Sequence, residues 1–275
     1  MNEIIPLWAE GAPGFEAGYG QPQPFLQAYP LPGVRDAVLI LPGGGYHHLA
    51  PYEGEPVAQA MRREGLSAFV LHYRHAPYVW PVPLRDAQRA LRLVRVLLDA
   101  EAEGPHRVAA MGFSAGGHLA GMLGTESGAG TPDADDPVER RSARPDALAL
   151  CYPVISMQAF VSEASLQNLT GHKNASFAVR RALSVEERVT ADTPPAFLWH
   201  TADDANVPVE NSLMMANAMS RAGVPFALHV FAHGRHGLGL GEQAGEDVRA
   251  WPALCGQWLR SVGFGAQAAA ESATR

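Results

Sequence analysis

The sequence predicts one α/β domain built on a mostly parallel, doubly wound sheet with helices on both faces. Its 275 residues are 47% hydrophobic and only 18% charged, which supplies enough apolar surface for a full core. Short apolar runs bounded by turn residues alternate with longer amphipathic segments. The runs are apolar at nearly every position, as expected of strands that are covered on both faces.

Six apolar runs are predicted to be strands, because each is short and is flanked by turn residues. In chain order they are Ala37–Leu41, Ala68–Tyr73, Val108–Gly112, Ala147–Tyr152, Ala196–His200 and Ala227–Phe231. The amphipathic segments predicted to be helices are Glu55–Glu64, Leu84–Glu101, Ala115–Leu123, Val209–Arg221 and Glu246–Val262. Met214, Met215 and Met219 have near-helical spacing and are interpreted as a buried stripe.

Several stretches fall outside this alternation. Residues 1–36 are rich in Pro and Gly; additional edge strands are left open there, because the pattern is too broken to assign them. Residues 126–146 are polar and are expected to form a surface loop. Residues 162–193 follow the fourth predicted strand, above the carboxyl edge where α/β domains bind ligands, so a small cap is expected there. The domain is predicted to span residues 1–265, with a disordered tail at 266–275.

Composition and charge limit the partners. The net charge is −7 and the basic residues are scattered, so no nucleic-acid partner is expected. The sequence shows neither a leader pattern nor an apolar stretch of membrane-spanning length, so no membrane association is expected. Cys151 and Cys255 lack metal-ligand spacing and are interpreted as buried thiols of a cytoplasmic protein. Homo-oligomerisation is left open by the sequence.

A candidate nucleophile lies between a predicted strand and a predicted helix. Gly112-Phe113-Ser114-Ala115-Gly116 fits G-x-S-x-G, a turn so sharp that small residues must flank the serine. The pattern alone is weak, but its strand-to-helix context is the one that the chemistry requires. The alternative is an ordinary glycine-rich turn whose serine caps the helix.

A serine nucleophile needs a base and an orienting acid, which in this architecture follow it on loops after later strands. Asp203 and Asp204 come after the strand at 196–200, and His233 and His236 come after the next strand. We favour Asp204, because Val207 can anchor its turn, and His236, because it leads into a glycine-rich stretch. Asp203 and His233 remain the alternatives.

A site for acyl transfer also needs amide donors for the developing oxyanion. One is expected from Ala115, the residue after the serine. The loop Pro42-Gly43-Gly44-Gly45-Tyr46 follows an early predicted strand and suits the remaining donors, because three glycines leave the backbone amides accessible. A phosphate cradle is disfavoured, since the loop has neither a P-loop Lys-Ser/Thr nor G-x-G-x-x-G spacing.

Taken together, these residues resemble the α/β-hydrolase superfamily, and within it the acetyl esterase and acetylxylan-esterase-like branch related to dienelactone hydrolases. The resemblance covers residues 4 to about 263. Its motifs are the loop 42–46, Gly112–His118, Ser142–Asp146, His200–Asp204, Val207–Ser212, and the opening Ile5–Trp8 with Gly11–Gly14. Pro42 stands where hormone-sensitive-lipase-like esterases have His, and Ser114 stands where dienelactone hydrolases have Cys.

The resemblance implies an α/β-hydrolase fold and a serine carboxylesterase that needs no cofactor or metal. The implied roles are Ser114 as nucleophile, Asp204 as acid, His236 as base, and the amides of Gly44, Gly45, Tyr46 and Ala115 as the oxyanion hole. The implied substrate is a small-molecule ester with a short acyl group, such as an acetylated sugar or xylan oligosaccharide, cleaved through an acyl-enzyme. The alternatives are a peptidase or amide hydrolase with the same triad, and a ligand-binding protein without catalysis.

Other polar and aromatic residues near these motifs have simpler interpretations. His118 is expected to be structural, whereas His47 and His48 either border the acyl pocket or are ordinary loop residues. Tyr78 and Trp80 are candidates for a sugar-stacking wall, but core packing is the favoured interpretation.

Overall fold

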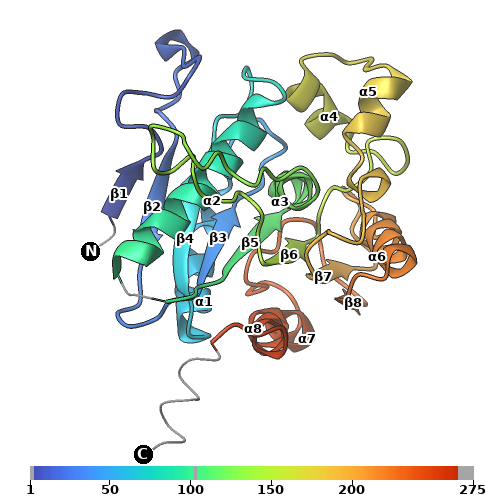
Figure 1. Cartoon of the computed structure of the whole chain (residues 1–275). Coiled ribbons are helices and arrows are strands. Elements are labelled where there is room, and N and C mark those ends of the chain that lie inside the picture. Colours follow the sequence, from blue (N-terminus) through green and yellow to red (C-terminus); the bar gives the residue numbers. More distant parts are fainter. Residues whose placement is uncertain (1–2, 102–103, 266–275) are drawn as a thin grey trace, which may run out of the picture.

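The computed structural model describes residues 3–101 and 104–265, so the predicted tail at 266–275 lies outside the described residues. An eight-stranded sheet with the order β1-β2-β4-β3-β5-β6-β7-β8 runs through the molecule (Figure 1). Strand β2 pairs antiparallel with both β1 and β4, whereas β4, β3 and the strands through β8 are parallel. The strands are β1 Glu3–Pro6, β2 Phe25–Tyr29, β3 Ala37–Leu41, β4 Ser67–His72, β5 Val108–Phe113, β6 Ala147–Cys151, β7 Ala196–Thr201 and β8 Phe226–Phe231.

Helices pack on both faces of the sheet, as predicted. The α-helices are α1 Glu55–Arg63, α2 Val82–Glu101, α3 Ala115–Thr125, α4 Glu163–Thr170, α5 Phe177–Ala182, α6 Glu210–Ala222, α7 Glu246–Arg249 and α8 Trp251–Ser261. Short 3-10 helices are η1 Ala17–Tyr19, η2 Pro51–Glu53 and η3 Val185–Glu187. None of the helices within the described ranges is long and apolar enough to cross a membrane.

The core consists of two apolar clusters, one on each face of the sheet. Leu39 and Leu41 of β3 pack in the cluster that includes buried residues of α2, α3 and α6. Val38 and Ile40 pack in the cluster that includes residues of α1 and α8. Because successive strand residues point to opposite faces, an entirely apolar strand is the sequence signature of this double coverage.

The structure corrects the predicted strands at the two sheet edges. β8 forms as predicted but is the edge strand, and its residues are half-buried or exposed, so the expected coverage on both faces is wrong for this strand. Residues 1–36, to which the sequence assigns no strand, supply β1 and β2 at the opposite edge. Backbone pairing joins β1 to β2 and β2 to β4, and such pairing leaves little apolar pattern to detect.

Two helix predictions also need correction. The helix predicted at 246–262 is interrupted at Ala250, giving α7 and α8. Pro252 accounts for the break, because proline has no amide hydrogen and its ring clashes with the carbonyl four residues earlier in a continuous helix. In α6, Met215 and Met219 are fully buried, but Met214 is only half-buried at the helix flank, so the predicted stripe holds two of the three methionines.

The inserted segment 162–193 contains α4, α5 and η3, which lie at one end of the molecule (Figure 1). An ion pair between Arg180 of α5 and Glu163 of α4 joins the two helices at 3.1 Å. Leu166, Leu169 and Val185 anchor the segment in the core cluster beneath it. The segment is therefore packed on the domain beside the carboxyl end of the sheet, where the cap was expected.

Candidate active site

Ser114 occupies a sharp turn between β5 and α3. Its backbone has φ 53° and ψ −118°, a strained conformation for a residue with a side chain. A Cβ atom at Gly112 would overlap the carbonyl oxygen of Gly116, and one at Gly116 would overlap the carbonyl oxygen of Leu41. The turn therefore requires glycine on both sides of the serine, which is the physical content of the sequence motif.

The structure joins the three favoured side chains in one hydrogen-bonded chain. Ser114 Oγ lies 2.8 Å from His236 Nε2, and His236 Nδ1 lies 2.6 Å from Asp204 Oδ2. The other carboxylate oxygen, Oδ1, accepts the amides of Asn206 and Val207 at 2.9 and 3.0 Å. Each side chain follows a different parallel strand, so the sheet brings them together at its carboxyl edge.

The alternative acid and base pair with each other instead. His233 Nδ1 lies 3.0 Å from Asp203 Oδ2, and both side chains are exposed to solvent. Asp203 also accepts the Gly234 amide at 2.7 Å, so its role is to order the turn that precedes His236. This arrangement leaves Asp204 and His236 facing Ser114.

The Asp204 carboxylate is buried yet strongly stabilised in its charged form. Burial acts to raise its pKa, but hydrogen bonds from His200, His236 and the Val207 amide outweigh that effect and hold the pKa well below its usual range. Asp204 is therefore ionised at neutral pH. An ionised carboxylate on Nδ1 fixes the His236 tautomer that leaves Nε2 free to accept a proton from Ser114.

The glycine loop borders Ser114. Gly44 and Gly45 line the pocket that contains Ser114, and within the described chain no acceptor binds their amides or that of Ala115. The Gly43 amide is already bound to Glu53 Oε2 at 2.7 Å. Tyr46 has a positive φ of 57° and a buried side chain, and it does not line this pocket. Its amide as an oxyanion donor stays a prediction.

His118 connects the glycine loop to Leu183 through two hydrogen bonds. Its Nδ1 lies 2.8 Å from Tyr46 Oη, and its Nε2 lies 2.7 Å from the Leu183 carbonyl oxygen. Burial lowers the pKa of His118 to about 4, so the ring is neutral, donates from Nε2 and accepts from the tyrosine. This is the structural role expected of it.

The pocket in front of Ser114 has a volume of about 570 Å³. It is lined by Gly44, Gly45, His48, Tyr52, Glu53, Ser114, Val161, Ser162, Glu163, Ala164, Ser165, Ala205, Asn206, Val207 and His236. The inserted segment thus contributes one wall. Among the histidines left open by the sequence, His48 borders this pocket.

Tyr78 and Trp80 do not line the Ser114 pocket. Tyr78 is buried and Trp80 packs against the core, as the favoured interpretation held.

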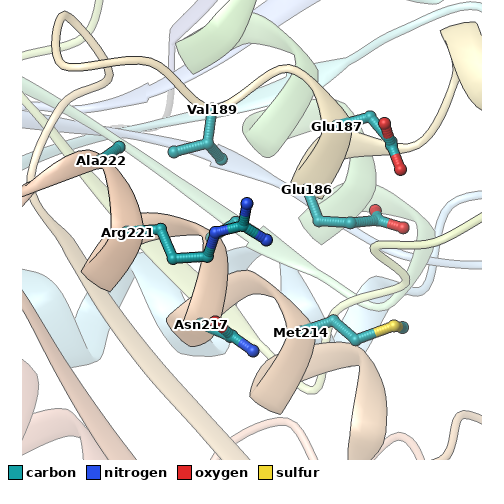
Figure 2. A pocket seen from close by; sticks show the side chains of 8 residues that line it. Glu186, Glu187, Val189, Met214, Asn217, Arg221 and Ala222 are labelled. Atoms are coloured by element: carbon teal, nitrogen blue, oxygen red, sulfur yellow. The ribbon is translucent and has the colours of Figure 1, made fainter.

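A second hollow, of about 500 Å³, lies between η3 and α6. Figure 2 shows the Glu186 and Glu187 carboxylates on one of these elements and Arg221 on the other. Among the described residues that line it there is neither a serine nor a histidine, so this hollow contains none of the three side chains Ser114, His236 and Asp204. In the described ranges, no cluster of three His, Cys, Asp or Glu side chains is arranged to hold a metal ion.

Two polar residues of the site were not found from the sequence. Glu53 is buried in the pocket wall, and Tyr152 donates its hydroxyl to Glu53 Oε1 at 2.7 Å. Ninety-nine residues separate the pair, and neither lies in a recognised motif. No local spacing rule identifies a hydrogen bond of this kind.

Comparison with known proteins identifies the family of this chain. The BD-FAE family profile matches residues 32–219. Over 237 residues the chain is 35% identical to the endo-1,4-beta-xylanase B of Butyrivibrio fibrisolvens, and over 239 residues 31% identical to the acetylxylan esterase of Xylanibacter ruminicola. These matches cover 84% and 82% of this chain but only 37% and 45% of the relatives, so the chain spans less than half the length of either.

Solved structures match along nearly the whole chain. The acetyl ester-xyloside bifunctional hydrolase of Caldicellulosiruptor lactoaceticus is 47% identical, with a TM-score of 0.89 over 95% of this chain and 97% of that one. The carboxylesterase Cest-2923 of Lactobacillus plantarum, at 24% identity and a TM-score of 0.78, shares the fold. The resemblance inferred from the motifs is confirmed: this chain belongs to the BD-FAE family of α/β hydrolases, and the relatives it matches include named esterases and carboxylic ester hydrolases.

Proposed function

We propose that this protein is a serine carboxylesterase that removes acetyl groups from acetylated sugars, including xylan oligosaccharides, through an acyl-enzyme. The observation that carries the proposal is the hydrogen-bonded chain from Ser114 through His236 to Asp204. It lies beside a glycine loop in which the Gly44 and Gly45 amides bind no acceptor within the described chain. Together these two features are the parts that acyl transfer requires.

In the proposed reaction, Ser114 Oγ attacks the ester carbonyl carbon while His236 Nε2 takes the hydroxyl proton. The amides of Gly44, Gly45 and Ala115 stabilise the negative charge that develops on the carbonyl oxygen. His236 then gives the proton to the leaving alcohol, and the acyl group remains on Ser114. A water molecule activated by the same imidazole releases the carboxylic acid, while Asp204 stabilises the transient imidazolium.

The side chains on the pocket wall support a sugar as the alcohol part of the ester. Four of the exposed side chains on its wall, those of His48, Tyr52, Glu163 and Asn206, are polar or amphipathic and can bind sugar hydroxyl groups. The names of the similar proteins, an acetylxylan esterase and an acetyl ester-xyloside hydrolase, point to the same substrate class.

The test is hydrolysis of p-nitrophenyl acetate and of acetylated xylo-oligosaccharides, with longer acyl esters and aminoacyl amides for comparison. We expect activity to be highest on acetyl esters and a fluorophosphonate to add one mass increment at Ser114. Ser114→Ala should lose activity by about 10⁴-fold or more. Ser165→Ala, which removes another hydroxyl from the same pocket, is the matched control and should remain active. Full activity in Ser114→Ala would refute the proposal.

A further inference from the structure

Glu53 is a buried carboxylate in the pocket wall that has no part in the steps proposed above. It ends the helix η2, is only 1% exposed, and lines the same hollow as Ser114 and His236. Both of its oxygens accept hydrogen bonds from neutral donors rather than from a cation. Because burying a carboxylate is costly, its presence beside the reacting serine calls for a function.

One oxygen of Glu53 holds the oxyanion loop. Its Oε2 accepts the Gly43 amide at 2.7 Å, immediately before Gly44 and Gly45. Gly43 is packed tightly against the nucleophile, since a Cβ atom there would lie 2.6 Å from the Phe113 carbonyl oxygen and 3.0 Å from Ser114 Cβ. The position of Gly43 therefore sets where the next two amides stand relative to Ser114.

The other oxygen holds Tyr152, which supports the histidine loop. Tyr152 donates its hydroxyl to Glu53 Oε1 at 2.7 Å and accepts the Gly239 amide at 2.9 Å. Its ring packs edge-on against His236, with ring centroids 5.2 Å apart. Burial and the Glu53 charge keep the pKa of Tyr152 well above its usual value, so the hydroxyl remains protonated and able to donate.

We infer that Glu53 is a positioning residue that fixes the distance between the oxyanion loop and the His236 loop across Ser114, through Gly43 on one oxygen and Tyr152 on the other. The inference rests on the proposed function. Both loops need such a tie because neither has regular structure, and Gly44, Gly45, Gly237 and Gly239 all adopt left-handed φ values. A displacement of about 1 Å between catalytic groups costs about 10²-fold in rate.

Glu53→Gln tests the link with little change in shape. Its amide keeps one acceptor oxygen but places an NH2 group against a donor, either the Gly43 amide or the Tyr152 hydroxyl. For p-nitrophenyl acetate we expect kcat to fall about 10- to 100-fold while KM stays within about threefold, because no contact with the substrate is lost. Tyr152→Phe should also lower kcat, because it keeps the ring but removes the hydrogen bond to Glu53.

The double variant distinguishes a shared link from two separate effects. If Glu53 and Tyr152 act through one connection, kcat of Glu53→Gln/Tyr152→Phe should lie close to that of the worse single variant. Rates are to be divided by the fraction of sites that a fluorophosphonate labels, so that unfolded protein does not count. Asp86→Asn is the control: it removes another fully buried carboxylate, the partner of Arg74, outside the pocket, and should lower Tm but leave kcat within about threefold.

The inference is overturned if kcat is unchanged in Glu53→Gln, if the change is in KM alone, or if the two losses multiply. If Glu53→Gln does not fold, Tyr152→Phe decides in its place: an unchanged kcat in that variant overturns the inference. Ser114→Ala is measured alongside. Activity in that variant would refute the proposed function, whereas an inactive Ser114→Ala beside a fully active Glu53→Gln would refute only the role of Glu53.

Discussion

His200 lies behind Asp204, with its Nε2 atom 3.5 Å from Asp204 Oδ2, the oxygen that also binds His236. Its Nε2 is 2.8 Å from the Val207 carbonyl oxygen and its Nδ1 is 2.8 Å from Ser212 Oγ. Both His200 and Asp204 are buried. These partners fit an imidazole with its proton on Nε2, which ties the turn carrying the acid to α6.

His200→Ala should therefore destabilise the protein and weaken catalysis together. The change leaves the Val207 carbonyl and the Ser212 hydroxyl without a partner and opens a cavity, so we expect the free energy of unfolding to fall by about 2–4 kcal/mol. Ser212→Ala removes only one of these bonds and should cost about 1 kcal/mol. Urea denaturation measures both. An equal loss of free energy of unfolding in His200→Ala and Ser212→Ala would show that His200 does not hold the turn.

Asp204→Asn should produce a pH-dependent change in stability. The folded-state pKa of Asp204 lies below that of the unfolded chain, so its contribution to stability is fully present above the unfolded value of about 4 and is lost as the pH falls below it. The difference in free energy of unfolding between the native protein and Asp204→Asn should thus be largest above about pH 5 and shrink below about pH 4.

The same variant should lose about 10⁴-fold in kcat at neutral pH, because asparagine no longer enforces the His236 tautomer. Asp203→Asn is the matched control, since it changes the neighbouring exposed acid, and it should keep most of the activity. Chemical denaturation at several pH values and steady-state kinetics measure the two effects. A stability difference that grows towards acid pH would contradict the assignment of a stabilised carboxylate.

The parts of the site that follow from local sterics or from sheet topology were predictable from the sequence. Gly112 and Gly116 reveal the turn because only glycine fits there, and Asp204 and His236 follow successive parallel strands that end at one edge. The same reasoning identified the six strands from Ala37 to Phe231. It assigned neither β1 nor β2, which are joined by backbone pairing, β1 to β2 and β2 to β4, and carry Pro and Gly nearby.

The contact between Glu53 and Tyr152 could not be predicted from the sequence, for a different reason. Their contact joins η2 to the end of β6, and it exists only because the folded sheet places two distant loops around Ser114. The break at Ala250 is an intermediate case: Pro252 marks it in the sequence, yet the apolar periodicity continues through the proline and conceals it. Side-chain hydrogen bonds between distant segments leave no periodic signal.

Tyr52→Ala should separate sugar binding from chemistry. Tyr52 is 49% exposed on the pocket wall, where its ring can stack on a sugar. A stacking contact of about 1 kcal/mol corresponds to a rise in KM of about fivefold for acetylated xylo-oligosaccharides. KM for ethyl acetate should not change, because its alcohol is too small to reach the ring. Tyr19→Ala, which removes a tyrosine that is 47% exposed outside this pocket, is the control. A parallel rise in KM for both esters would exclude the stacking role.

Gly116→Ala should damage the site more than its single methyl group suggests. The new Cβ atom would overlap the Leu41 carbonyl oxygen and lie 2.5 Å from the Pro42 carbonyl oxygen, at the point where β3 enters the oxyanion loop. These are backbone atoms, so relief requires the Ser114 turn to move away from Gly44 and Gly45. We expect the free energy of unfolding to fall by about 1–3 kcal/mol and kcat to fall by about 10². Gly18→Ala, where no atom lies within 4 Å of the new Cβ, should change neither; wild-type kcat in Gly116→Ala would show that the loop and the turn are not in the contact described.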